Sequence, residues 1–255
     1  MSLGRRWLRV AVPLALIALS TSGAAWSPRL DLPLTTGAWS APGGVNAGLL
    51  LWYDTAEVGT MSLAPRLRYW FDKSGHAQHA QVSSGQFQPY PTLASGVAGL
   101  QFSGAAVQLP TSIPLEPMTA MIVFRQNSEG LSHPLMGSRT RFSGITMEFG
   151  QLRFYSNGQS TGASTARTTT GLTITTVRTA TGASDGIQYN GGTETPFSIT
   201  TTESMNLIGG MFIAGTTKYF AGAIMEVVIW GRSLSPSERQ AAHRALGAKW
   251  GISVP

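Results

Sequence analysis

The chain has 255 residues, of which 12% are charged and 42% hydrophobic, and it contains no cysteine. A charged share about half that of an ordinary globular domain, together with 30 glycines, favours many strands and turns over a helical bundle. The absence of cysteine excludes disulfides and cysteine-based zinc sites. The net charge of +6 includes Arg5, Arg6 and Arg9, and the other arginines are scattered, so no nucleic-acid partner is expected.

The first 46 residues are expected to lie outside the main domain. Residues 1–25 combine a basic start with the apolar run Val10–Leu19 and the small-residue stretch Ser20–Ala25, which is the pattern of a secretory signal peptide. A retained N-terminal arm that docks on a neighbouring subunit is the alternative. The apolar run is too short for a stable transmembrane anchor. Residues 26–46 are rich in proline and small residues and are expected to form a linker or extended arm.

Residues 47–255 show short apolar runs between turn residues, which predict about ten antiparallel strands in a sandwich. Leu172–Arg178 alternates apolar and polar residues, the pattern of a half-exposed strand. Ser103-Gly104 and Gly150-Gln151 are expected to close hairpins, and Asn190-Gly191 to form a tight turn. The expected strands are Leu49–Tyr53, Leu67–Phe71, Gly99–Phe102, Ala106–Leu109, Met118–Arg125, Ile145–Phe149, Leu152–Tyr155, Leu172–Arg178, Ile187–Tyr189, Met205–Ile208 and Ala223–Trp230.

One helix is expected, at the end of the chain. Ser235-Pro-Ser-Glu238 is a capping box with proline at the first helical position, in which Ser235 and Glu238 satisfy each other's backbone N–H groups. Gly251 is the expected end of this helix, because glycine readily adopts the left-handed conformation that follows a last turn.

The run Phe220–Arg239 (FAGAIMEVVIWGRSLSPSER), followed by Lys249-Trp250-Gly251, has a specific pattern. With Trp70-x-Asp72-x-Ser74-Gly75 and Leu100–Gly104 (LQFSG), it resembles the concanavalin A-like lectin/glucanase superfamily in its laminin-G-like form. The resemblance covers residues 48–252 and implies an all-β, antiparallel two-sheet jelly-roll sandwich with a short C-terminal helix. Members of this superfamily bind sugars or proteins, cleave glycans or build larger assemblies. Some hold calcium, which is therefore the one cofactor left open.

The acidic residues argue against catalysis. The related glucanases carry paired carboxylates on one strand as E-x-D-x-x-E, a spacing that places alternate side chains on one face. This sequence has no such run: Glu148 and Glu226 each stand alone, and the nearest acidic pair is Asp54 and Glu57. Glu226 is expected to be a structural hydrogen-bonding partner. We therefore expect no enzymatic activity and no catalytic residues.

Histidines are too few and too dispersed to suggest a metal centre. His76-x-x-His79 follows Asp72 closely enough for a metal site to be conceivable, but a solvated turn is the favoured interpretation. No metal site is therefore expected.

Aromatic side chains are the remaining candidates for ligand binding, because sugar C–H faces stack on rings. Strand alternation places Phe154 inward and puts Arg153 and Tyr155 together on the opposite face. The expected ligand-binding residues are Arg153, Tyr155, Asn157, Tyr189 and Asn190.

These observations predict a non-catalytic, lectin-like binding or adhesion module that is secreted and recognises a glycan or a cell-surface protein. The alternative is a structural component of a virion, such as a phage decoration or fibre protein, whose N-terminal arm docks on neighbouring subunits. A glycan-cleaving enzyme is the least favoured of the three.

Overall fold

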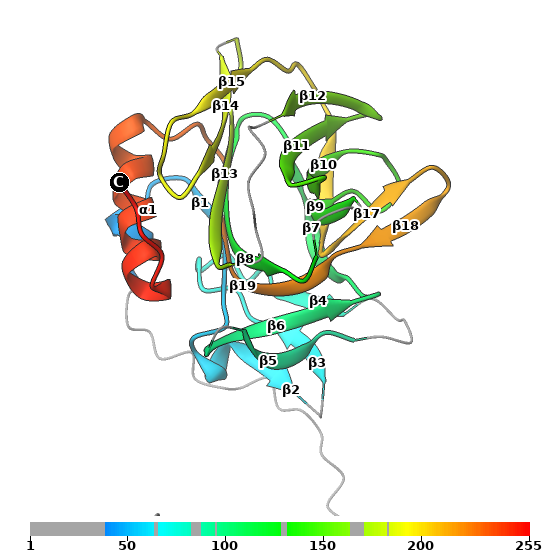
Figure 1. Ribbon diagram of the computed structural model, residues 1–255, viewed down its shortest axis with the longest axis vertical. Coiled ribbons are helices and arrows are strands. Elements are labelled where there is room, and N and C mark those ends of the chain that lie inside the picture. The colour runs from blue at the N-terminus through cyan, green and yellow to red at the C-terminus, as the bar shows by residue number, and fades with distance from the viewer. Residues whose placement is uncertain are drawn as a thin grey trace, which may run out of the picture. The chain divides into compact units, whose positions relative to one another are not determined.

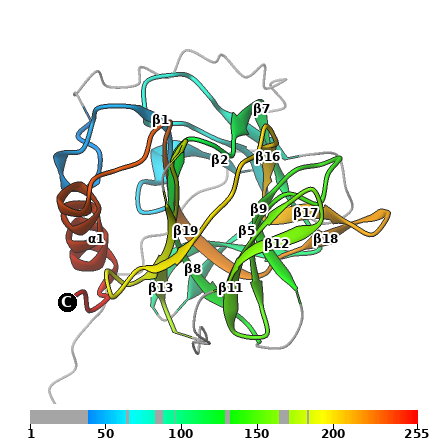
Figure 2. The same ribbon diagram turned by 90° about the horizontal axis from the view of Figure 1, so that it is seen from above.

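The computed structural model describes residues 39–63, 66–82, 88–94, 96–128, 132–163, 171–182 and 184–255. Within these residues, two large antiparallel sheets pack face to face and one α-helix lies on the outer side of the first sheet (Figures 1 and 2). The predicted all-β sandwich with a C-terminal helix is confirmed. The segment expected to be a signal peptide or a docking arm lies outside the described residues.

The first sheet has eight strands in the order β15-β14-β13-β8-β19-β6-β5, with β1 paired to β19. Its central strand, β19, is ten residues long and is buried along nearly its whole length. The strands are β1 (Leu49–Asp54), β5 (Tyr90–Ala94), β6 (Val97–Ser103), β8 (Met118–Gln126), β13 (Thr173–Thr179), β14 (Asp185–Tyr189), β15 (Thr195–Phe197) and β19 (Ala221–Trp230).

The second sheet has nine strands in the order β12-β11-β10-β9-β16-β7-β4-β3-β2. A separate hairpin of β17 and β18 packs against β9, where the side chain of Met211 occupies the space beside Gly137. The strands are β2 (Met61–Leu63), β3 (Leu67–Trp70), β4 (Ala80–Val82), β7 (Val107–Pro114), β9 (His133–Gly137), β10 (Gly144–Glu148), β11 (Gln151–Ser156), β12 (Gln159–Ala163), β16 (Ser204–Ile208), β17 (Gly210–Ile213) and β18 (Thr216–Tyr219).

Two apolar cores hold these layers together. The larger core fills the space between the sheets, and alternate residues of each strand supply it. The smaller core lies between the outer face of the first sheet and helix α1 (Pro236–Trp250). It contains Trp52, Met121, Val123, Ile174, Met225, Val228, Trp230, Ala242, Leu246 and Trp250.

The prediction that Ser103-Gly104 closes a hairpin is wrong. β6, before this dipeptide, pairs with β5 and β19 in the first sheet, whereas β7 pairs with β4 and β16 in the second. Gly104 has a φ of 76°, so the chain turns sharply there and crosses from one sheet to the other. A Ser-Gly turn can precede a strand of either sheet, so the local sequence does not show which sheet the next strand joins.

The prediction that Leu172–Arg178 is half exposed is also wrong. All seven residues of β13 are buried. Thr176 shares the outer face with Ile174, and its hydroxyl lies 2.9 Å from Nε2 of His243 on α1. Thr173 and Thr175 lie on the other face with Val177, which packs between the sheets. Neither face of the strand is solvated, because α1 covers one and the second sheet covers the other.

The end of the expected linker is part of the domain. Residues 42–44 form the short 3-10 helix η1 (Pro42–Gly44), and a second such turn, η2, covers Val58–Thr60. Ala41 and Val45 are buried in the smaller core, and the backbone carbonyl of Val45 accepts a 2.7 Å hydrogen bond from the Trp230 indole. Gly43 lies so close to the backbone of Ala241 that a Cβ there would clash.

Helix α1 begins and ends as expected. The Ser235 hydroxyl accepts from the Glu238 N–H and the Glu238 carboxylate accepts from the Ser235 N–H, which is the predicted capping box. Gly251 follows in the left-handed conformation. In the described residues no helix is long and apolar enough to cross a membrane.

Replacing Ser235 with alanine removes the side-chain acceptor of this cap. We expect the free energy of unfolding to fall by about 1 kcal/mol. Urea denaturation of the variant and the wild type measures the difference, and an unchanged midpoint would show that the cap contributes nothing.

His243 gives the fold a dependence on pH. Its ring is fully buried, and burial together with the nearby Arg239 lowers its pKa to about 4. Free histidine titrates near 6.5, so between about pH 6.5 and pH 4 the unfolded chain gains a proton that the folded chain excludes. The free energy of unfolding should therefore fall as the pH drops through this window, by roughly 3 kcal/mol from this residue.

The variant His243→Gln tests this expectation, because glutamine can still reach Thr176 and does not titrate. Unfolding midpoints measured from pH 7 to pH 4 should fall less steeply for the variant than for the wild type. Two parallel curves would show that His243 does not cause the loss.

Candidate functional site

The hairpin of β10 and β11 presents a polar and aromatic group of side chains on the outer face of the second sheet. Opposite residues in the hairpin are Thr146 with Arg153 and Glu148 with Gln151, so a two-residue turn joins the strands. Ile145, Met147, Leu152 and Phe154 point into the core. Strand alternation therefore places Glu148, Arg153 and Tyr155 outward; with Phe149 we call these four residues the hairpin face.

Glu148 is the centre of the polar contacts on the hairpin face. Its Oε2 atom accepts a 2.7 Å hydrogen bond from the Tyr155 hydroxyl and lies 3.1 Å from Nε of Arg153. Phe142 stacks on the Tyr155 ring with centroids 4.4 Å apart. Burial, followed by the contact with Glu148, raises the pKa of Tyr155, so its hydroxyl remains a donor at neutral pH. The carboxylate and the guanidinium are thus held in a fixed position while both stay partly exposed.

Phe149 occupies the turn of this hairpin with 67% of its surface exposed. Its φ is 49° and that of Gly150 is 73°, both in the left-handed region. The same two-residue geometry occurs at Asn157-Gly158 and Ala214-Gly215. Asparagine and glycine adopt it readily, whereas a bulky residue does so at a cost of about 1–2 kcal/mol. A phenylalanine that is both strained and exposed is a candidate for ligand contact.

Arg153 and Tyr155, predicted as binding residues, do lie side by side. Tyr155 was expected to be exposed, but it is only 7% exposed because Phe142 covers its ring. Phe149 and Glu148 were not predicted: Phe149 was assigned to a strand, and Glu148 was treated as an isolated acid. The sequence feature that could have identified Phe149 is a large aromatic residue before glycine, at a position where a tight hairpin turn normally carries asparagine.

The other three predicted residues lie elsewhere. Asn157 is in the turn at the opposite end of β11, where its N–H donates to the Ser143 hydroxyl. Tyr189 is buried between the sheets, and Asn190 forms a tight turn in which its side chain accepts from the Ile174 N–H. These two residues belong to the first sheet and are not part of the hairpin face. The tight turn predicted at Asn190-Gly191 is confirmed.

A second group of titratable side chains lies on the outer side of the first sheet, beneath α1. We call Asp54, Lys73, Glu226 and Lys249 the buried cluster. Asp54 and Glu226 are direct cross-strand neighbours on β1 and β19. Lys249 Nζ lies 2.7 Å from Asp54 Oδ2 and 2.8 Å from Glu226 Oε2. The two carboxylates thus share one ammonium.

All four carboxylate oxygens of the buried cluster have partners. Glu226 accepts from the indole of Trp52 at 2.6 Å and from that of Trp250 at 2.5 Å, which confirms its predicted role as a structural hydrogen-bonding partner. Asp54 accepts from the Ala56 N–H and from both lysines. A cavity of about 330 Å³ adjoins this cluster between η1 and α1, and Trp52, Glu226 and Lys249 contribute to its wall.

The pKa values of the two carboxyl groups of the buried cluster are shifted in opposite directions. Burial, followed by the charge of Asp54, raises the pKa of Glu226. Burial alone would also raise the pKa of Asp54, but its contacts with Lys249 and Lys73 outweigh that effect and hold the pKa below its usual value. Burial therefore favours the protonated form of Glu226, whereas the two lysines favour the ionised form of Asp54.

Asp72 and the histidines after it form a turn. The Asp72 carboxylate accepts from the N–H groups of Trp52, Ser74 and Gln78, and Nδ1 of His79 accepts from the Asp72 N–H. Within the described part of the chain, no group of three or more histidine or acidic side chains could hold a metal ion.

No protein-family model and no curated protein matches this sequence. Solved structures do share its fold. A mutant of the Trypanosoma rangeli sialidase that displays trans-sialidase activity is 15% identical with a TM-score of 0.53, over 86% of this chain and 37% of the other. An arabinofuranosidase complexed with arabinofuranosyl-α-1,2-xylobiose is 10% identical with a TM-score of 0.54, over 72% and 51%.

The binding domain of botulinum neurotoxin DC in complex with SialylT is 13% identical with a TM-score of 0.53, over 79% of this chain and 52% of the other. The chain thus spans between about a third and a half of the chains it resembles. At these identities the likeness shows the fold, a β-sandwich of the kind present in glycosidases and sugar-binding proteins.

The comparison corrects two sequence-based predictions. The chain was expected to be a non-catalytic binding or adhesion module, or a virion component, and not an enzyme. The structures that share its fold include a sialidase and an arabinofuranosidase, which are glycan-cleaving enzymes. The acidic residues are dispersed in the sequence, but the pairing of β1 with β19 brings Asp54 beside Glu226, which lies 172 positions later in the chain.

The strain at Phe149 is directly measurable. Phe149→Asn places a residue that tolerates the left-handed conformation in the turn, so the free energy of unfolding should rise by about 1 kcal/mol. Ala214→Asn makes the matched change in the turn of the β17–β18 hairpin. Chemical denaturation of both variants gives the comparison; a loss of stability in Phe149→Asn would show that the Phe149 ring stabilises the fold.

Proposed function

We propose that this chain works in glycan cleavage as a domain that engages the carbohydrate, and that the hairpin face is where the sugar binds. The observation that carries the proposal is Phe149, which is 67% exposed at a position that disfavours it. The named functions of the structural neighbours support a carbohydrate as the ligand. The concanavalin A-like assignment is part of the same proposal, and the motif at residues 220–239 supports it.

The chemistry of the hairpin face matches that of a sugar. One face of a pyranose or furanose ring presents C–H groups that stack on an aromatic ring, here Phe149. The ring's hydroxyl groups both donate and accept hydrogen bonds. Glu148 offers acceptor oxygens and Arg153 offers donors, with side chains 20% and 29% exposed. Gln151, opposite Glu148 in the hairpin, adds an amide within reach of Arg153.

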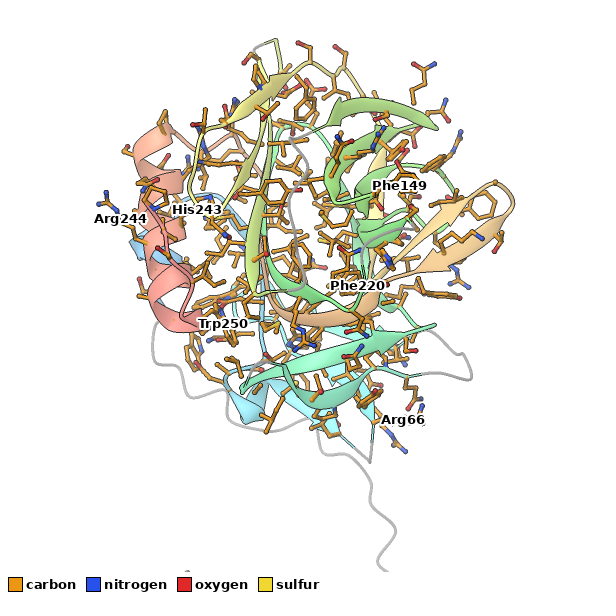
Figure 3. All side chains as sticks on the ribbon, in the orientation of Figure 1. Arg66, Phe149, Phe220, His243, Arg244 and Trp250 are labelled. Atoms are coloured by element: carbon orange, nitrogen blue, oxygen red, sulfur yellow. The ribbon has the colours of Figure 1, made fainter. Side chains whose placement is uncertain are left out.

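The hairpin face is also organised before a ligand arrives. Tyr155 and Phe142 fix Glu148 from below, and Glu148 in turn fixes Arg153. Little side-chain entropy would be lost when a sugar binds, so each new hydrogen bond would contribute more to affinity. The face lies on the opposite side of the molecule from α1, which carries His243 and Trp250 (Figure 3). The helix therefore leaves access to it open.

Export remains part of the proposal, because the N-terminal pattern is that of a secretory signal and glycans are abundant outside the cell. The mass of the native protein purified from its source tests this. A chain shortened by about 24 or 25 residues would support export, and a chain that retains those residues would contradict it.

The binding experiment compares the wild type with Phe149→Ala on an array of sialylated, arabinosylated and neutral glycans. Wherever the wild type binds, Phe149→Ala should weaken binding by about tenfold or more, since a stacking aromatic contributes roughly 1 kcal/mol beyond the area it buries. Leu93→Ala is the matched control: Leu93 is 75% exposed on β5, in the other sheet. Release of reducing sugar from each bound glycan is measured in parallel.

Equal binding by the wild type and Phe149→Ala would refute the assignment of the site. Phe149→Asn provides a further check, because it should gain stability and lose binding together. A variant that gains stability and keeps its affinity would show that the strain in this turn has no connection with a ligand.

A further inference from the structure

The buried cluster places an amine between two carboxyl groups. Lys249 Nζ lies 2.7 Å from Oδ2 of Asp54 and 2.8 Å from Oε2 of Glu226. Asp54 is the last residue of β1, Glu226 is opposite it on β19, and Lys249 is in the last turn of α1. Three separate segments thus bring together a nucleophile, a carboxyl carbon and a second carboxyl that contacts the nucleophile.

The surroundings of the buried cluster exclude water from the two carboxyl groups. The side chains of Asp54 and Glu226 are 1% and 0% exposed, and that of Lys249 is 30% exposed. The indoles of Trp52 and Trp250 both donate to Glu226, and Lys249 Nζ lies 5.0 Å from the centre of the Trp250 ring. An ion pair in such a site carries a large desolvation cost, which a neutral bond between the same groups would remove.

We infer that Lys249 and Asp54 become joined by an intramolecular amide bond, which the folded chain forms without another enzyme. The contact between Lys249 Nζ and the Asp54 carboxylate is the arrangement that precedes the bond. The product would tie β1 covalently to α1, and so connect the first strand of the described domain to its last helix.

The reaction is a condensation and requires no oxidant or reductant. Glu226 first takes a proton from the Lys249 ammonium and passes it to Oδ2 of Asp54. The resulting amine attacks Cγ of Asp54, the Nζ–Cγ bond forms, and Glu226 carries a second proton from Nζ to Oδ2. The Cγ–Oδ2 bond then breaks, and the oxygen leaves as water with both protons. One ammonium and one carboxylate are thereby converted into one amide and one water, and Glu226 ends in the protonation state in which it began.

Glu226 has the properties that this transfer needs. It contacts the attacking nitrogen directly, and burial together with the neighbouring Asp54 charge raises its pKa, which makes it a better proton acceptor than an exposed glutamate. The indole donors of Trp52 and Trp250 fix its orientation.

Lys73 also contacts Asp54, at 2.8 Å, but its second carboxylate partner is Glu57. Its ammonium is held 4.1 Å from the ring centres of both Trp39 and Trp52. Lys249 instead contacts Asp54 and Glu226 together, so the group that would accept its proton lies beside the carbon that it would attack. Lys73 therefore pairs with Glu57, while Lys249 is the reacting amine.

Mass spectrometry of the full-length, denatured chain tests the inference. We expect a mass lower by one water than that of the same chain without the bond. Digestion with trypsin should give a branched peptide that links Asp54 to Lys249, with no cleavage after Lys249. A wild-type chain with no loss of water and with normal cleavage at Lys249 would overturn the inference, whatever the variants show.

Variants identify the residues involved. Lys249→Arg preserves the charge but should restore the full mass, and Glu226→Gln should slow or abolish the loss of water. Lys73→Arg should retain the bond, and a loss of water that instead maps to Lys73 would overturn the choice of Lys249. Asp54→Asn should release ammonia in place of water. None of these results depends on glycan binding, so this inference and the proposed function can fail separately.

Discussion

The interaction on which the rest of this structure depends is the set of hydrogen bonds received by the Glu226 carboxylate. Trp52 on β1 and Trp250 and Lys249 on α1 all donate to this one side chain of β19. A buried carboxylate without such donors would cost several kcal/mol. The position of the helix and that of the first strand are therefore both set by the need to satisfy Glu226. The smaller core forms around Glu226, and α1 shields this part of the outer face of the first sheet from water.

The sequence was most informative where a rule is local. The capping box at Ser235 and Glu238, the left-handed Gly251 and the turn at Asn190-Gly191 all follow from neighbouring residues, and the structure confirms them. The sandwich itself could be predicted from short apolar runs. The predictions failed where the segments that contact each other are distant in sequence. Nothing near Ser103-Gly104 shows which sheet the next strand joins, and nothing in Leu172–Arg178 shows that a helix 60 residues later covers it.

In the candidate sites too, local sequence predicted some features, whereas contacts between distant residues determined the others. Alternation correctly placed Arg153 and Tyr155 on one face, but the burial of Tyr155 depends on Phe142, which approaches from a neighbouring turn. The pairing of Asp54 with Glu226 was invisible because cross-strand contacts join residues far apart in the chain. Phe149 could have been identified, since a bulky residue before glycine in a two-residue loop departs from local preference without a structural benefit.

The buried cluster also determines when the domain can finish folding during synthesis. Asp54 emerges from the ribosome together with Trp52, 172 residues before Glu226 and 195 residues before Lys249. Until they appear, β1 has neither its strand partner β19 nor a lysine from α1, and the central strand of the first sheet is missing. Folding therefore cannot proceed progressively from the N-terminus. A nascent chain of this kind has to keep its early apolar strands from aggregating until β19 and α1 have been made, which makes it a natural client for chaperones that hold unfolded chains.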